Sequence, residues 1–100
     1  MSLPLRFRPE AVDEFVEAAD WYDEQRPGLG DEFVESVQSK LATIVEWPEG
    51  FPKVHNEFRR ALVSRFPYAI CYQLFDAYIL VVAVFHVRRD PDVWKQRGTG

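Results

Sequence analysis

The chain contains the run Tyr78-Ile79-Leu80-Val81-Val82-Ala83-Val84-Phe85, and the rest of the fold has to accommodate it. Its β-branched and aromatic residues favour a β-strand, and it is far shorter than the roughly 20 residues of a membrane-spanning helix. Apolar and polar residues do not alternate in it, so both faces of the strand are expected to be buried. The segment 68–75 is also apolar on both faces. The sequence therefore predicts a sheet that is covered on both sides.

The second half of the chain predicts three consecutive strands. Apolar residues recur with a period of two over about 58–65 and 68–75, which predicts the first two strands. The third strand, over about 78–87, contains the apolar run quoted above. The links Phe66-Pro67 and Asp76-Ala77 are short enough for hairpin turns. These strands are therefore expected to form an antiparallel meander.

The first half predicts one strand and two helices. Apolar residues alternate over 3–7, and Pro4 places this strand at a sheet edge because proline cannot donate a ladder hydrogen bond. Apolar residues at helical spacing predict an amphipathic helix over 9–26. A second helix is expected to begin near Asp31, whose side chain can cap it, and to end before Pro48. The short link makes the two helices an antiparallel hairpin.

These elements define an α+β fold for one domain over residues 1–100. It consists of an N-terminal strand, an antiparallel helical hairpin packed on a mainly antiparallel four-stranded sheet (β-α-α-β-β-β), and a short C-terminal tail. One helical hairpin covers only one face of such a sheet. A tail of about a dozen residues is too short to cover the other face fully. We therefore expect a second polypeptide to complete the cover.

Composition and charge narrow the class of protein. Hydrophobic residues make up 47% and charged residues 28%, which is typical of a globular domain. One cysteine, no signal peptide and no membrane-spanning run predict a cytoplasmic protein. Residues 1–50 hold twelve acids and four bases, whereas residues 51–100 hold four acids and eight bases. An anionic partner is therefore expected to contact the second half, although the net charge of −4 argues against broad nucleic-acid binding.

Three segments resemble the RelE/ParE toxin superfamily. The run AADWYDEQRPGLG (18–30) is similar to its first helix and helix–helix loop, RRALVSRFPYAICY (59–72) to its central hairpin, and VFHVRRDPDVW (84–94) to its end. They follow in the superfamily's order and span nearly the whole chain. The resemblance implies the toxin of a bacterial type II toxin–antitoxin pair. It also implies a small antitoxin whose disordered segment folds on the toxin surface.

The superfamily has two main activities, ribosome-dependent cleavage of mRNA and ParE-like poisoning of DNA gyrase. Cleavage by the RNA 2′-hydroxyl needs a base, an acid and cations around the developing charge. The candidates for such a nuclease are His86, Arg65 and Arg88. Trp94 lies near the position where the nuclease branch commonly has a tyrosine, and an indole has no titratable group. The missing acid favours a ParE-like toxin without catalysis of its own, with the ribosome and mRNA as the alternative target.

The expected contact residues follow from the ParE-like interpretation. Target contacts are expected at the basic C-terminal end, at Arg88, Arg89, Trp94, Lys95 and Arg97. Antitoxin contacts are expected on the hairpin and the apolar sheet face, at Trp21, Tyr22, Val81 and Ala83. A structural interpretation stays open, in which His86 is a satisfied polar residue and Trp94 anchors the tail.

Other classes of function receive little support from the sequence. Neither a metal nor a cofactor is predicted, because no ligand cluster or binding motif is present. A non-toxic binding module on the same scaffold is the remaining alternative.

Overall fold

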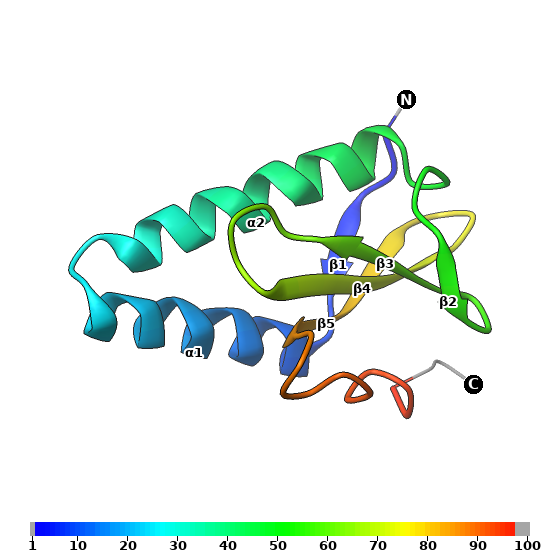
Figure 1. Cartoon of the computed structure of the whole chain (residues 1–100). Coiled ribbons are helices and arrows are strands. Elements are labelled where there is room, and N and C mark those ends of the chain that lie inside the picture. Colours follow the sequence, from blue (N-terminus) through cyan, green and yellow to red (C-terminus); the bar gives the residue numbers. More distant parts are fainter. Residues whose placement is uncertain (1, 98–100) are drawn as a thin grey trace.

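The computed structural model describes residues 2–97 and shows a helical hairpin packed on a five-stranded sheet (Figure 1). The elements are β1 (Leu5–Phe7), α1 (Pro9–Gln25), α2 (Leu29–Glu46), β2 (Lys53–His55), β3 (Phe58–Leu62), β4 (Tyr68–Leu74) and β5 (Ile79–His86). The strand order is β1-β5-β4-β3-β2, with β1 parallel to β5 and the other pairs antiparallel. The α+β class, the hairpin, the meander and the edge position of β1 are confirmed. Residues 1 and 98–100 of the expected domain lie outside the described part.

One detail of the expected sheet is wrong. Lys53–His55 lies outside the four expected strands, yet it pairs with β3 as a fifth strand at the far edge. All three of its residues are exposed and the pairing contains a register shift, so they show no apolar alternation. An exposed three-residue edge strand of this kind has no pattern that sequence analysis can detect.

The helix boundaries lie beside proline and glycine residues, and the start of α2 differs from the expected one. α1 begins at Pro9 and ends before Pro27. α2 begins at Leu29 rather than near Asp31, after Gly28 with φ of +89°, a backbone conformation that favours glycine. The expected cap is supplied by the other helix, because Oδ1 of Asp23 accepts the Gly30 N–H at 2.7 Å. The carboxylate of one helix thereby joins the two at the hairpin loop.

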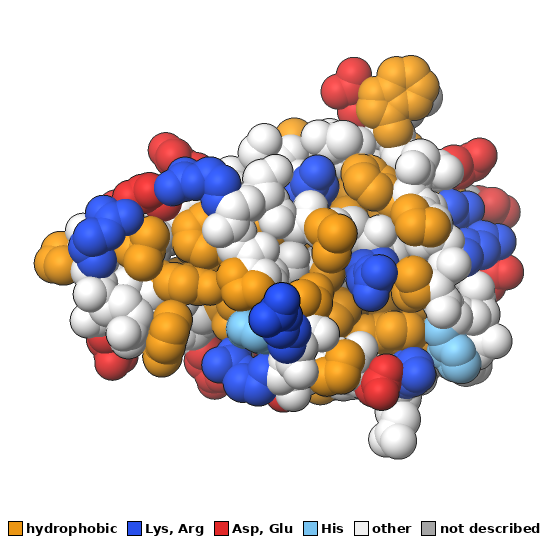
Figure 2. Space-filling view, in the orientation of Figure 1, with side chains coloured by type: hydrophobic (Ala, Val, Ile, Leu, Met, Phe, Trp, Pro, Cys, Tyr) orange, Lys and Arg blue, Asp and Glu red, His pale blue; other side chains and the backbone are white. Residues whose placement is uncertain are grey.

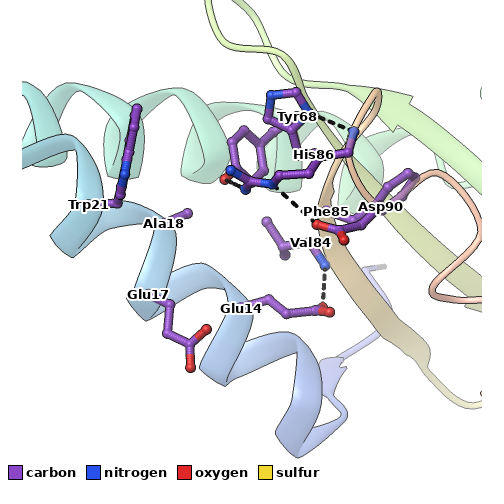
Figure 3. Close-up of a pocket in the computed structure, with 10 residues that line it drawn as sticks. Glu14, Glu17, Ala18, Trp21, Tyr68, Val84, Phe85, His86 and Asp90 are labelled. Carbon is purple, nitrogen blue, oxygen red and sulfur yellow. Dashed lines mark hydrogen bonds and ion pairs between the residues drawn. The ribbon is translucent and has the colours of Figure 1, made fainter.

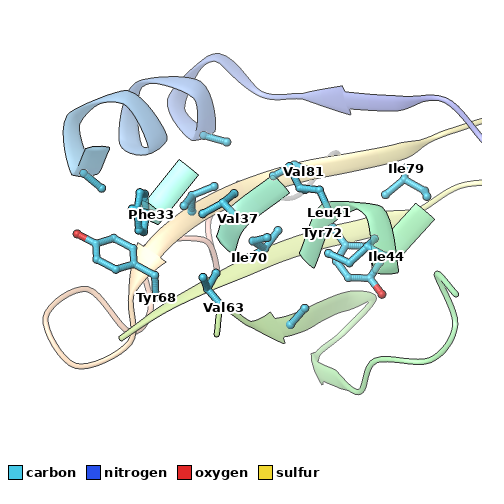
Figure 4. Packing of buried hydrophobic residues seen from close by; sticks show 14 of the residues in the cluster. Phe33, Val37, Leu41, Ile44, Val63, Tyr68, Ile70, Tyr72, Ile79 and Val81 are labelled. Carbon is cyan, nitrogen blue, oxygen red and sulfur yellow. The ribbon is translucent and has the colours of Figure 1, made fainter. Parts of the chain in front are cut away.

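The main core lies between the helices and one face of the sheet (Figure 4). Phe33, Val37 and Ile44 of α2 are fully buried over Ile70 and Tyr72 of β4. Burying each such aliphatic or aromatic side chain contributes about 1.5–3 kcal/mol. The Tyr72 hydroxyl remains paired, because it donates to the Pro48 carbonyl at 2.6 Å. The burial also raises the pKa of Tyr72 to about 12.

A β-bulge in β5 decides which residues face the helices. Cys71 lies opposite Ala83 and Tyr72 opposite Val81, so Val82 is the extra residue. Val82 and Ala83 consequently both belong to the cluster on the second face of the sheet. Val84 returns to the helix side. The bulge therefore sets the orientation of every side chain at the carboxyl end of β5.

The chain's own tail covers the central part of the second sheet face, which was expected to need a second polypeptide, whereas Leu62 at the end of β3 stays 58% exposed. Figure 1 shows the tail (orange to red) turning back from the end of β5 and running along the sheet. Trp94 is only 4% exposed and joins a cluster of sheet residues, namely Phe58, Ala69, Cys71, Leu80, Val82, Ala83 and Phe85. Several of these side chains are small, so one indole closes an area that a longer segment was expected to need. Coverage of the sheet therefore does not by itself require a second polypeptide.

Candidate functional site

The candidate site begins at His86, where β5 ends. Nδ1 of His86 accepts the backbone N–H groups of Arg88 and Arg89 at 3.2 and 3.1 Å. Because two donors point at Nδ1, the neutral ring carries its proton on Nε2. The ring also contacts Tyr68 edge to face, with centroids 5.4 Å apart. His86 therefore caps the turn after β5, and its remaining nitrogen is a donor.

A hollow of about 240 Å³ lies between α1 and this turn (Figure 3). Trp21, which is 49% exposed, and Ala18 form the α1 side, and Tyr68 and His86 form the sheet side. Arg89 also lines the hollow and donates to the Tyr68 hydroxyl at 3.0 Å. This hydrogen bond raises the pKa of Arg89 above its usual value. The hollow thus combines aromatic walls with a cation that is already engaged.

Glu14 and Arg97 form an ion pair beside this hollow. The two guanidinium nitrogens lie 2.9 Å from the two carboxylate oxygens, and the side chains are only 23% and 15% exposed, respectively. Glu14 also accepts the Val84 N–H at 3.1 Å, and Arg97 donates to the Val82 carbonyl at 3.2 Å. The Glu14 carboxylate raises the pKa of Arg97 above its usual value. The pair therefore occupies the edge of β5 beyond the end of β1.

Trp94 holds the tail against the other face of the sheet. Its ring lies 5.3 Å from Phe58 and 5.9 Å from His55, measured between centroids. Its Nε1 donates to the Pro91 carbonyl at 2.9 Å, so the buried indole has a partner. In this conformation Trp94 is an anchor of the tail, as the structural interpretation expected.

Arg65 is held by α2. It donates to Glu32 at 2.7 Å, and Glu32 also accepts Arg26 at 2.9 Å. Arg65, and secondly Arg26, lower the pKa of Glu32 below its usual value. The positive φ of 73° at Arg65 places it in the left-handed region, which is uncommon for a residue other than glycine. The guanidinium of one nuclease candidate is therefore engaged away from His86.

The expected contact residues fall into two groups. Arg88, Arg89 and Lys95 are exposed, whereas Trp94 and Arg97 hold the tail. Of the expected antitoxin contacts, Trp21 is exposed and Tyr22 is buried. Val81 and Ala83 are 0% exposed, Val81 under the helices and Ala83 under the tail, so no partner reaches their side chains in this conformation.

Three residues that sequence reasoning missed complete the site. Glu14 lies among other acidic residues of α1, yet its partner Arg97 is 83 positions away in the sequence. Tyr68 joins Arg89 and His86, and Leu62 is 58% exposed beside a second, mainly apolar hollow that also includes Tyr68 and His86. No local pattern in the sequence marks these contacts, because each depends on tertiary packing.

The surface around the site is hydrophobic and basic. On the face shown in Figure 2, basic side chains lie among hydrophobic ones, and the acidic side chains lie mostly toward the edges.

Cys71 is buried, which raises its pKa to about 12 and leaves its thiol protonated. Over residues 2–97, His, Cys, Asp and Glu form no group of three or more that could hold a metal ion. Neither α1 nor α2 is long and apolar enough to cross a membrane.

Comparison with known proteins identifies the class of this fold. Solved structures of a chromosomal ParDE system and of the toxin RelE share this fold. A family profile described as the ParE toxin of the type II toxin–antitoxin system parDE matches residues 5–91. The chain therefore belongs to the ParE toxin family. No curated protein sequence matches it.

Solved structures share the fold at low sequence identity. A chain of the chromosomal ParDE system from P. aeruginosa has a TM-score of 0.75 and 14% identity, over 84% of this chain and 95% of that one. A mutant of the E. coli toxin RelE in the free state has a TM-score of 0.67 and 18% identity, over 97% and 95%. The same toxin in complex with an antitoxin RelBc peptide has a TM-score of 0.65 and 17% identity, over 100% and 99%.

Proposed function

We propose that this toxin is neutralised by a small antitoxin and acts in the cytoplasm by poisoning DNA gyrase, without catalysis of its own. The family match over residues 5–91 is the observation that carries this proposal. The matched range includes Arg88 and Arg89 and ends before Lys95. The exposed cations Arg88, Arg89 and Lys95 supply the first contacts with the target.

The geometry at His86 argues against the nuclease alternative. A general base needs a free lone pair within reach of the 2′-hydroxyl. Nδ1 of His86 is occupied by two backbone N–H groups, and Nε2 carries the proton. Arg65 is engaged with Glu32, and Trp94 offers no titratable group. These contacts support an interaction mechanism rather than general-base catalysis by His86.

The antitoxin surface extends from Trp21 over His86 to Leu62. The two hollows along this path share Tyr68 and His86, so they form one continuous surface. Trp21 and Leu62 are large apolar side chains that are about half exposed, which is typical of a protein-binding surface. Trp21→Glu is expected to weaken antitoxin binding at least about tenfold, because an aromatic anchor dominates such interfaces. Isothermal titration with the antitoxin measures this change, and an unchanged Kd removes Trp21 from the interface.

The target is tested with supercoiled plasmid, gyrase and ATP. The expected result is inhibition of supercoiling or accumulation of linear cleavage product. Arg88→Ala reduces this effect, whereas Arg6→Ala, which removes an exposed cation from β1, leaves it unchanged. Absence of both inhibition and cleavage product removes the gyrase proposal.

Two further assays decide between the remaining alternatives. Codon-specific cleavage of mRNA on programmed ribosomes, abolished by His86→Ala, would replace gyrase with the ribosome and mRNA as target. The similarity to RelE is the reason to include this assay. Unaffected growth on expression without the antitoxin, at verified soluble levels, would favour a non-toxic binding module.

A further inference from the structure

The tail after β5 is attached to the rest of the protein mainly through two side chains. We call residues 91–97 the strap. Within the described residues, its backbone hydrogen bonds from residue 91 onward stay inside the tail: Val93 to Asp90, Lys95 to Asp92 and Arg97 to Trp94. Trp94 packs on the second sheet face, and Arg97 binds Glu14 and the Val82 carbonyl. A segment held by so few contacts is a candidate for local opening.

The strap is also the cover of the second sheet face. In the buried cluster on that face, every member except Trp94 belongs to β3, β4 or β5. Val93, which packs against the same cluster, also comes from the strap. The helices lie on the opposite face with the main core. Lifting the strap therefore exposes the sheet residues beneath Trp94, among them Cys71.

Glu14 and Arg97 form the second attachment of the strap. The pair is bidentate and mostly buried, and it satisfies a backbone donor at Val84 and an acceptor at Val82. We call this ion pair the latch. Because charge-assisted, bidentate hydrogen bonds are strong, loss of either partner shifts the strap toward its open state.

We propose that the strap opens as a unit, that the latch sets how often it opens, and that Trp94 and Arg97 reach the toxin's target only in the open state. The last part rests on the proposed function and on the expectation from the sequence that both residues contact the target. In the closed state the Trp94 side chain is buried and the Arg97 guanidinium is bound to Glu14. The target thus binds the open state, which is a minor conformation, and the latch controls the population of that state.

The single cysteine of the chain reports this opening directly. Cys71 is 0% exposed and belongs to the cluster under Trp94. Its alkylation by iodoacetamide in the native protein follows the population of the open state when the strap recloses faster than the thiol reacts. Glu14→Gln is expected to raise the alkylation rate at least about tenfold, which corresponds to about 1.4 kcal/mol. Glu24→Gln, the same change at an exposed position of α1, is the matched control and leaves the rate unchanged.

Two measurements separate strap opening from general loosening of the fold. If Glu14 and Arg97 act as one latch, the double variant Glu14→Gln with Arg97→Gln alkylates about as fast as the faster single variant. Low urea concentrations should change the rate only weakly, because local opening exposes little surface. Additive effects of the two substitutions, or a rate that follows global unfolding by urea, would overturn the proposal.

The gyrase assay distinguishes failure of the strap from failure of the proposed function. Faster alkylation of Glu14→Gln together with stronger gyrase inhibition supports both parts. Faster alkylation without any gyrase effect, in the wild type or the variant, retains the strap and removes the target. An unchanged alkylation rate for Glu14→Gln, with gyrase inhibited by the wild type, overturns the latch and retains the target.

Discussion

Gly30→Ala is expected to destabilise the protein through the contact between the two helices. A Cβ at position 30 would lie 2.5 Å from the Ala19 carbonyl oxygen and 2.7 Å from Oδ1 of Asp23. Real Cβ atoms do not approach other atoms this closely, and the Ala19 carbonyl belongs to the backbone of α1. α1 and α2 must therefore separate to relieve the contact with the Ala19 carbonyl, and the Asp23 side chain must also turn away and lose its hydrogen bond to the Gly30 N–H.

The size of this effect follows from three contributions. Overpacking of this kind costs about 1–3 kcal/mol. Loss of the Asp23 cap adds about 1 kcal/mol. Replacing glycine by alanine in a helix returns about 0.5–1 kcal/mol. The net loss is about 2 kcal/mol, which lowers Tm by about 8–16 °C in a domain of this size.

Urea and thermal unfolding followed by circular dichroism measure the loss. Gly28→Ala is the matched control, because a Cβ there meets nothing within 4 Å and only its left-handed backbone is strained. It should cost about 1 kcal/mol. A Gly30→Ala variant within about 0.5 kcal/mol of the wild type would refute the close helix contact, since this is the range of neutral surface changes.

Three further predictions concern single side chains. Tyr72→Phe removes the donor to the Pro48 carbonyl and should lower the free energy of unfolding by about 1–2 kcal/mol in urea titrations, with Tyr78→Phe, whose ring is partly exposed, as the control. The lowered pKa of Glu32 stabilises the protein above the usual carboxyl pKa, and this contribution is lost as the pH falls through the lowered value. Glu32→Gln should therefore flatten the acid side of a stability–pH profile, and an unchanged profile would contradict the ion pair with Arg65. Nitrogen NMR of His86 at neutral pH should show the proton on Nε2, and a proton on Nδ1 would contradict the cap on the turn after β5.

The sequence was sufficient for the elements with strong periodicity. The apolar pattern of each of these elements, α1, α2 and the three meander strands, is contained in its own residues. The type and order of the elements can therefore be read from the sequence. The predicted start of α2 lies later than the observed one because Gly28 and Asp23, rather than Asp31, organise the first turn of the helix. β2 was missed because an exposed edge strand has no apolar face. The predicted boundaries are therefore wrong where the residue that sets a boundary is remote in the sequence, or where no apolar pattern marks the element.

The candidate site was less predictable because its geometry depends on a bulge and on remote pairs. Strict alternation along β5 would place Val81 and Ala83 on one face, and the bulge at Val82 separates them. The role of Trp94 as an anchor depends on small residues beneath it, which hydrophobicity alone does not reveal. Glu14 has the same local pattern as its solvated neighbours on α1, although it alone among them binds Arg97.

The charge asymmetry between the two halves of the chain has an internal explanation as well as an external one. Arg65 binds Glu32, and Arg97 binds Glu14, so two basic residues of the second half are engaged by acids of the first. Arg59 is engaged too, by the Phe51 carbonyl at 2.6 Å. The excess of positive charge available to a partner is therefore smaller than the composition indicates, and Arg60 and Arg88 are exposed members of it. A target that recognises this toxin by charge alone would find few contacts, so we propose that recognition also uses the apolar surface beside Arg88, which the antitoxin would then cover, and, once the strap opens, Trp94.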